Sequence, residues 1–165
     1  MKTHNDDEDD DYNKKEEHWK YIERMLQDGN VVIYPEKDEL FIDIDTRLQY
    51  HDFLHLFGMM ENNFAGGGDY KKEVWESRSG PPRKHVVVTL PFDVNEVMRI
   101  ALQASLGSDP QREILSLARM SVGITRPTIF VESPGFKWKK KKPDKLEYSR
   151  PVFKGSLIDE DDVPF

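Results

Sequence analysis

The chain has 165 residues, a formal net charge of −7, 37% hydrophobic and 33% charged residues, and no cysteine. This length is sufficient for one domain with a hydrophobic core, and the low hydrophobic share indicates that part of the chain stays solvated. The absence of cysteine excludes disulfides, thiolate zinc sites and a cysteine nucleophile, and it fits a cytoplasmic protein. The acidic N-terminus is not typical of a secretory signal, and no apolar run approaches the roughly 20 residues of a membrane helix. No membrane partner is therefore expected.

The charges are segregated along the chain. Residues 1–17 contain three basic and eight acidic residues, whereas residues 18–133 contain 13 basic and 17 acidic residues. Residues 134–150 contain seven basic and two acidic residues, and residues 151–165 contain one and four. Salt screens exposed charges over about 10 Å, so local charge decides the local field. The segment 134–150 is therefore the strongly positive part of an otherwise acidic chain.

Hydrophobic periodicity and turn residues predict a disordered acidic arm followed by alternating helices and strands. Apolar residues from Trp19 to Leu26 recur at helical spacing, Thr46 is a plausible N-cap, and Pro110 stands in the first turn of a helix. In chain order, we expect an arm at 1–11, a helix at 12–27, strands at 31–34 and 40–45, a helix at 46–60, strands at 71–77 and 84–90, helices at 95–106 and 110–120, and a strand at 128–132.

The order of these elements predicts the fold class. From Leu40 onward it reads strand, helix, strand, strand, helix, helix, strand. With the two consecutive helices counted as one layer, this is the split βαβ pattern of a ferredoxin-like sheet. We therefore expect an α+β fold with a ferredoxin-like or RRM-like antiparallel sheet and helices on one face. The expected organisation is an acidic arm at 1–11, this domain at 12–133, a basic linker at 134–158 and an acidic tail at 159–165.

The last residues form the most distinctive motif. They are Asp159, Glu160, Asp161, Asp162, Val163, Pro164 and Phe165. This motif resembles the acidic C-terminal tail of bacterial single-stranded-DNA-binding proteins. The resemblance implies that the Phe165 ring fills an apolar pocket on replication or repair proteins while the acidic run meets a basic rim. It also implies work on single-stranded DNA in replication or recombination, in the cytoplasm of a bacterial cell. An arbitrary acidic end is the alternative.

A second motif interleaves aromatic rings with cations. It comprises Phe136, Lys137, Trp138, Lys139, Lys140, Lys141 and Lys142. Proteins that bind single strands use cations along the phosphates and aromatic faces beneath the bases, and each stacked base contributes about 1–3 kcal/mol. The segment is therefore predicted to bind DNA, and the acidic tail could fold back and compete for it. A solvated charge run that keeps a linker soluble is the alternative.

Asp43 and Asp45 alternate on one predicted strand, so their side chains point the same way and could hold Mg²⁺ or Mn²⁺. With His85 on a later strand, they resemble the hhhDhD and s-x-H motifs of the archaeo-eukaryotic primase superfamily, although Arg83 occupies the small-residue position. The resemblance implies that the aspartates are catalytic metal ligands, that His85 contacts a phosphate, and that Asp109 is the later aspartate. A strand end followed by an ordinary sheet histidine is the alternative.

Three functional classes follow from these motifs. The preferred hypothesis is a non-catalytic single-stranded-DNA-binding protein, and its alternative is a minimal primase or polymerase-like nucleotidyltransferase. A third class is an adaptor that mimics the tail without touching DNA.

The stretch from Arg99 to Pro110 resembles uncharacterised bacteriophage proteins, to which no function attaches. His51 and His55 share one face of a predicted helix, either as a metal pair or as part of a polar surface.

Overall fold

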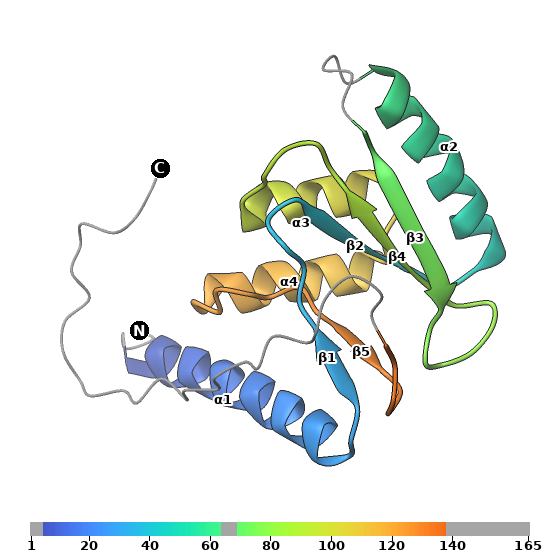
Figure 1. Ribbon diagram of the computed structural model, residues 1–165. Coiled ribbons are helices and arrows are strands. Elements are labelled where there is room, and N and C mark those ends of the chain that lie inside the picture. Colours follow the sequence, from blue (N-terminus) through green and yellow to red (C-terminus); the bar gives the residue numbers. More distant parts are fainter. Residues whose placement is uncertain (1–4, 64–68, 138–165) are drawn as a thin grey trace.

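The computed structural model describes residues 5–63 and 69–137. Of residues 5–11 it describes the backbone but not the side chains. The described part of the chain is α+β, as predicted (Figure 1). Its elements are α1 (Asn5–Gln27), β1 (Val31–Ile33), β2 (Glu39–Ile44), α2 (Arg47–Asn63), β3 (Lys71–Glu76), β4 (Lys84–Thr89), α3 (Glu96–Ser105), α4 (Pro110–Ser121) and β5 (Phe130–Glu132). Each predicted helix and strand is present with slightly different bounds. The helix α1 begins at Asn5, within the arm predicted to be disordered.

Side-chain caps begin three of the helices where the sequence places them. The hydroxyl of Thr46 accepts from the backbone N–H of Gln49 at 3.1 Å. Asn95 caps α3, and Asp109 caps α4, which has Pro110 in its first turn. Such a cap satisfies a backbone N–H that has no partner inside the helix and contributes about 1 kcal/mol. These local contacts explain why the helix starts could be predicted from sequence.

The central sheet is antiparallel, with the strand order β2-β4-β3. Alternate residues of β2 and β4 turn apolar side chains towards α2, which lies along one face of the sheet (Figure 1). Burial of these side chains removes apolar surface from water and is the main stabilising contribution at this face. The core here contains Leu40, Ile42, Ile44, Phe53, Phe57, Met60, Val86 and Val88.

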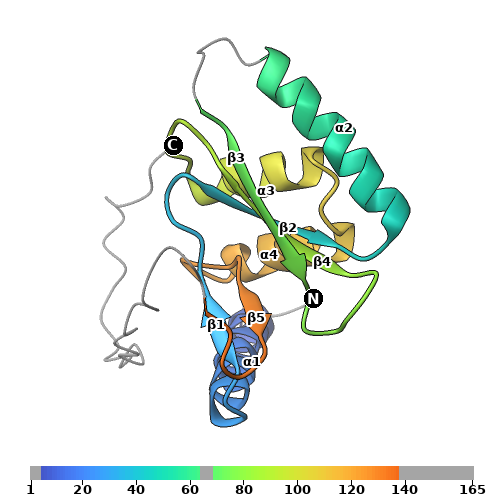
Figure 2. The same ribbon diagram turned by 45° about the vertical axis from the view of Figure 1, so that its right-hand side comes forward.

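A two-stranded antiparallel ribbon of β1 and β5 lies against the opposite face of the sheet. The ring of Phe130 on β5 stacks on Phe41 at a centroid distance of 4.4 Å and packs with Val87. The other face of the ribbon packs against α1, through a cluster that includes Ile22 and Ile129. The ribbon is thus a layer between the sheet and α1, and α1 and α2 lie at opposite ends of the molecule (Figure 2).

The outer edge of β2 is closed by polar groups from α3, α4 and the turn between them, and none of the described strands pairs with it. Five backbone groups on this edge have partners: Arg99 for the carbonyl of Glu39, Gln103 for the N–H of Phe41, Arg112 for the carbonyl of Phe41, Ser108 for the N–H of Asp43, and the N–H of Asp109 for the carbonyl of Asp43. A buried backbone group without a partner would cost about 1–3 kcal/mol. These backbone groups are therefore hydrogen-bonded, and a further strand cannot pair with this edge.

This closed edge explains how the sheet departs from the prediction. In a ferredoxin-like sheet the last strand would pair with β2, but β5 pairs with β1. The order β2-β4-β3 agrees with the first three strands of such a sheet, and the ferredoxin-like topology as a whole is not confirmed. The helices also occupy more than one face, since α2 covers one side of the sheet and α1 lies beyond the ribbon on the other.

None of the helices in the described residues combines the length and the apolar character needed to cross a bilayer.

The helix α1 carries a buried histidine, His18. It is buried at 5% exposure, and within the described residues neither of its ring nitrogens has a hydrogen-bond partner. Burial and, to a smaller extent, the positive charge of Arg119 lower the pKa of His18 to about 4. The neutral ring therefore packs as an aromatic group, with its centroid 5.1 Å from that of Trp19.

Stability is expected to fall as the pH drops from about 6.5 to about 4, because the unfolded chain binds a proton at His18 that the folded chain does not. The loss attributable to His18 is at most about 3 kcal/mol. His18→Phe should remove this part of the pH dependence, measured as the difference in unfolding free energy from the unmodified protein by urea titration at several pH values. His51→Phe, at an exposed position, is the control. Parallel pH profiles for the unmodified protein and His18→Phe would contradict the prediction.

Candidate functional site

A cleft lies where β2, the β3–β4 loop, α4 and β5 meet, and its volume is about 310 Å³. Tyr21 of α1 and Phe130 of β5 supply aromatic walls, and Ser77 and Ser79 lie on the loop side. The charged side chains that line the cleft are Asp43, Asp45, Arg78, Arg83, Arg112 and Arg119.

The three residues predicted as a catalytic set all line this cleft. Asp43 and His85 are direct cross-strand partners on β2 and β4, and His85 Nε2 lies 3.6 Å from Asp43 Oδ1. Asp45 follows the end of β2, and its Oδ1 lies 3.3 Å from Arg83 Nε. The strand alternation that places both aspartates on one face was readable from sequence. The structure brings the three together but pairs each aspartate with a basic side chain.

Glu132 on β5 is a partner of His85 that the sequence did not reveal. Its carboxylate oxygen Oε1 makes a short hydrogen bond with His85 Nδ1 and accepts from Trp75 Nε1 at 2.9 Å. Glu132 is 2% exposed, and the ring of Phe130 stacks on His85 at 3.9 Å. These contacts fix the imidazole and leave its Nε2 facing Asp43. The available sequence signal was the position of this carboxylate, which falls on the same face of the short strand as a buried apolar residue.

Asp43 lies where an ionised carboxylate is unfavourable. Burial raises the pKa of Asp43 above its usual value, and electrostatic interactions with Arg112 and His85 offset this effect only in part. The neighbouring carboxylates of Asp45 and Asp109 raise the pKa further. The ionised form of this side chain therefore costs folding free energy.

The arginines keep the cleft positive because most of their hydrogen-bond partners are neutral. Arg112 donates to the carbonyls of Phe41 and Ile129 at 2.8 and 2.9 Å, and its contact with the carboxylate of Glu113 is 4.0 Å long. Arg119 donates to the carbonyl of Pro127 at 3.2 Å. These residues were not predicted, although Arg112 and Arg119 lie seven positions apart and therefore on one face of α4.

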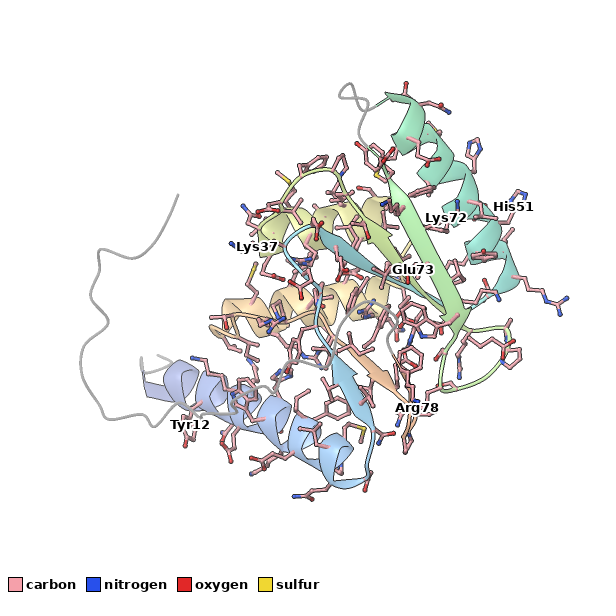
Figure 3. All side chains as sticks on the ribbon, in the orientation of Figure 1. Tyr12, Lys37, His51, Lys72, Glu73 and Arg78 are labelled. Atoms are coloured by element: carbon pink, nitrogen blue, oxygen red, sulfur yellow. The ribbon has the colours of Figure 1, made fainter. Side chains whose placement is uncertain are left out.

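The β3–β4 loop contributes the remaining two arginines. Arg78 Nη1 donates to the side chain of Asn30 at 3.3 Å, which joins this loop to the turn before β1. Figure 3 shows Arg78 beside the ribbon of β1 and β5. Arg83 is exposed and pairs with Asp45. With four arginines against two aspartates, the lining of the cleft is net positive in a chain whose net charge is −7.

The other predicted metal-binding residues are not gathered here. Asp109 caps α4, accepting from the N–H of Arg112 at 3.1 Å, and is not part of the cleft lining. His51 and His55 are exposed on α2, where His51 projects away from the sheet (Figure 3). In the part of the chain that the structure describes, no group of three or more histidine, cysteine or acidic side chains could hold a metal ion. A metal in the cleft would therefore depend on Asp43 and Asp45.

The predicted DNA-binding segment begins close to the cleft. The ring of Phe136 lies 5.5 Å from that of Trp75, and Trp75 in turn meets the His85 ring edge-on at 6.2 Å. Lys137 follows and is exposed. Trp138, Lys139 to Lys142 and the tail 159–165 lie outside the described residues.

Asp43→Asn is expected to raise the free energy of unfolding at pH 7. Because the folded-state pKa of Asp43 lies above its unfolded value, the folded protein is favoured at low pH and loses this stability as the pH rises through the folded-state pKa. Asparagine has no charge to bury. The gain in unfolding free energy from Asp43→Asn should therefore disappear below the pKa of aspartate in the unfolded chain, which is about 4. Urea titrations at pH 3.5 and pH 7 would measure this, with Asp52→Asn on the surface of α2 as the control. A less stable Asp43→Asn protein at pH 7 would contradict it.

Comparisons with known proteins found no match for the chain among protein-family models, curated proteins or solved structures. The resemblances of the tail and of Asp43, Asp45 and His85 therefore stay predictions. The site is interpreted from its own geometry.

Proposed function

We propose that this protein binds single-stranded DNA and that the cleft receives phosphate groups of the strand. The observation that carries the proposal is the convergence of four arginines on one cleft of an acidic chain. Guanidinium groups form bidentate, charge-assisted hydrogen bonds with phosphate oxygens, which makes arginine well suited to phosphate recognition. Arg78 and Arg83 also extend this positive charge to the exposed rim of the cleft.

The aromatic side chains at the cleft support a single strand in preference to a duplex. Tyr21 is partly exposed in the cleft wall, and the partly buried rings of Phe136 and Trp75 lie against each other next to His85. Unstacked bases gain free energy by lying on such rings, whereas bases in a duplex are already stacked. A cleft of about 310 Å³ also suits one strand, because it is too small to enclose a duplex.

The segment after the described residues extends the same chemistry. The described residues end at Lys137, directly after Phe136, whose ring contacts Trp75. The next residues in the sequence are the predicted binding residues Trp138 and Lys139 to Lys142. The resemblance of residues 159–165 to single-stranded-DNA-binding tails supports the further proposal that replication or repair proteins are recruited, during replication or recombination in the bacterial cytoplasm.

Replacing Arg78 and Arg83 together with Gln should weaken binding to fluorescent oligo-dT. The slope of log K against log salt should also become shallower, by about 0.7 for each phosphate that the variant no longer neutralises. Fluorescence anisotropy over a range of salt concentrations measures both effects, with duplex DNA of equal length as the weaker ligand.

Arg47→Gln with Arg126→Gln is the matched control, because it removes the same charge from exposed positions outside the cleft. Equal weakening by the two double variants would show that net charge, and not the cleft, governs affinity. The absence of oligo-dT binding by the unmodified protein would reject the proposed function.

A nucleotidyltransferase is the second candidate, because Asp43, Asp45 and His85 do line one cleft. Mg²⁺ is commonly bound by one or two carboxylates together with substrate phosphates, and two aspartates on one face of β2 fit that requirement. A bound metal would neutralise charge on the phosphates. Arg83 would have to release Asp45, and His85, which Glu132 holds in place, would be positioned to contact a phosphate oxygen.

If this second candidate is correct, the unmodified protein should add nucleotides to a primed template in the presence of Mn²⁺ or Mg²⁺. Asp43→Asn with Asp45→Asn should abolish the addition and leave the circular dichroism spectrum unchanged. Under the binding proposal, the same variant should bind oligo-dT as well as before or more tightly, because two negative charges near the phosphates are removed. An unmodified protein that adds no nucleotide with either metal rules the second candidate out.

A further inference from the structure

We infer that the cleft is a pocket for the end of a DNA strand, and that it holds one terminal nucleotide by its phosphomonoester group. This inference rests on the proposed binding of single-stranded DNA and names the part of the strand that the cleft takes. Two features carry it: the size of the cleft and the kind of partners that its arginines have.

The size of the cleft suits one nucleotide. Its volume of about 310 Å³ is at the lower end of the range for small-molecule pockets, which is about 300–1,000 Å³. Domains that bind single strands along a groove cover about 4–16 nucleotides. The cleft accommodates far less than such a length, so it accounts for one position of a strand.

The walls of the cleft come from several elements of the fold. The cleft has residues from α1, α4, β5 and the β3–β4 loop around it, with sheet residues of β2 and β4 at its floor. The hydrogen bond from Arg78 to Asn30 joins the loop to the turn before β1. This bond holds the loop against the turn before β1, and the cleft remains open to solvent.

The charges indicate a terminal phosphate in preference to an internal one. Arg119 is half-buried and donates to the neutral carbonyl of Pro127. Arg78, on the exposed rim of the cleft, also donates to neutral groups, the side chains of Asn30 and Met25. A partly buried cation with neutral partners favours an anionic ligand. A terminal phosphomonoester carries about −1.5 to −2 charges at pH 7, more than the single charge of an internal phosphodiester.

The test compares oligo-dT strands that differ only at their ends. Internally labelled strands with a 5′-phosphate, a 3′-phosphate or hydroxyl ends, and a circular strand of equal length, are titrated by fluorescence anisotropy. One of the two phosphorylated strands should bind about tenfold more tightly than the hydroxyl and circular strands. Which of them does so identifies the end. Arg119→Gln should remove this preference, whereas Arg126→Gln, also on the segment around α4 but outside the cleft, should keep it.

A second measurement does not require DNA binding and does not depend on one variant. Thymidine 5′- and 3′-monophosphates should raise the melting temperature of the protein, and thymidine should not. Arg83→Gln, at an exposed position of the cleft rim, should reduce the rise if Arg119→Gln fails to fold.

The outcomes separate the two proposals. Equal affinity for all four strands, with no effect of either monophosphate, overturns the strand-end pocket and leaves single-strand binding intact. A rise in melting temperature with a monophosphate, without binding of any strand, supports the phosphomonoester pocket and rejects the proposed function.

Discussion

The polar closure of the outer edge of β2 is the constraint on which the rest of the structure depends. A strand edge normally attracts another strand, but here α3, α4 and their connecting turn satisfy its backbone groups. Gly107, at a φ of +82°, allows the sharp turn that brings Ser108 to the N–H of Asp43. Since this edge is closed, β5 pairs with β1 and lies over the face of the sheet. Phe130 and Glu132 reach His85 from that position, which makes the candidate site a product of the same closure.

Arg112 joins this architecture to the electrostatics of the cleft. One guanidinium group binds the carbonyl of Phe41 on the β2 edge and that of Ile129 before β5, and it lies 4.5 Å from the Phe130 ring centroid. It therefore fixes the distance between the sheet and the ribbon while adding a positive charge to the cleft. The buried carboxyl of Asp43 lies in the same cleft. A fold selected for stability alone has little reason to keep these charged groups in its interior, which favours a functional role for them.

Features determined by neighbouring residues could be predicted from the sequence, and features determined by distant contacts could not. Helical spacing, N-caps such as Thr46 and turn residues located the elements, and strand alternation placed Asp43 and Asp45 on one face. The pairing of β5 with β1 and the contact of Glu132 with His85 arise between residues far apart in the chain. Arg119 resembles an ordinary helix residue until its neutral partner is known. The sequence thus singled out Asp43, Asp45 and His85, whereas the arginines that line the same cleft were missed.

The position of Tyr21 has a consequence for the dynamics of the molecule. This residue belongs to the helix α1, and its ring lines the cleft one turn away from the buried His18. A ligand that contacts Tyr21 is bound fully only while α1 remains docked on the ribbon, so ligand binding and helix docking are thermodynamically linked. Occupancy of the cleft would then slow amide hydrogen exchange along α1, including in turns far from the ligand. The N-terminal helix would in this way report on the state of a site to which it contributes a single ring.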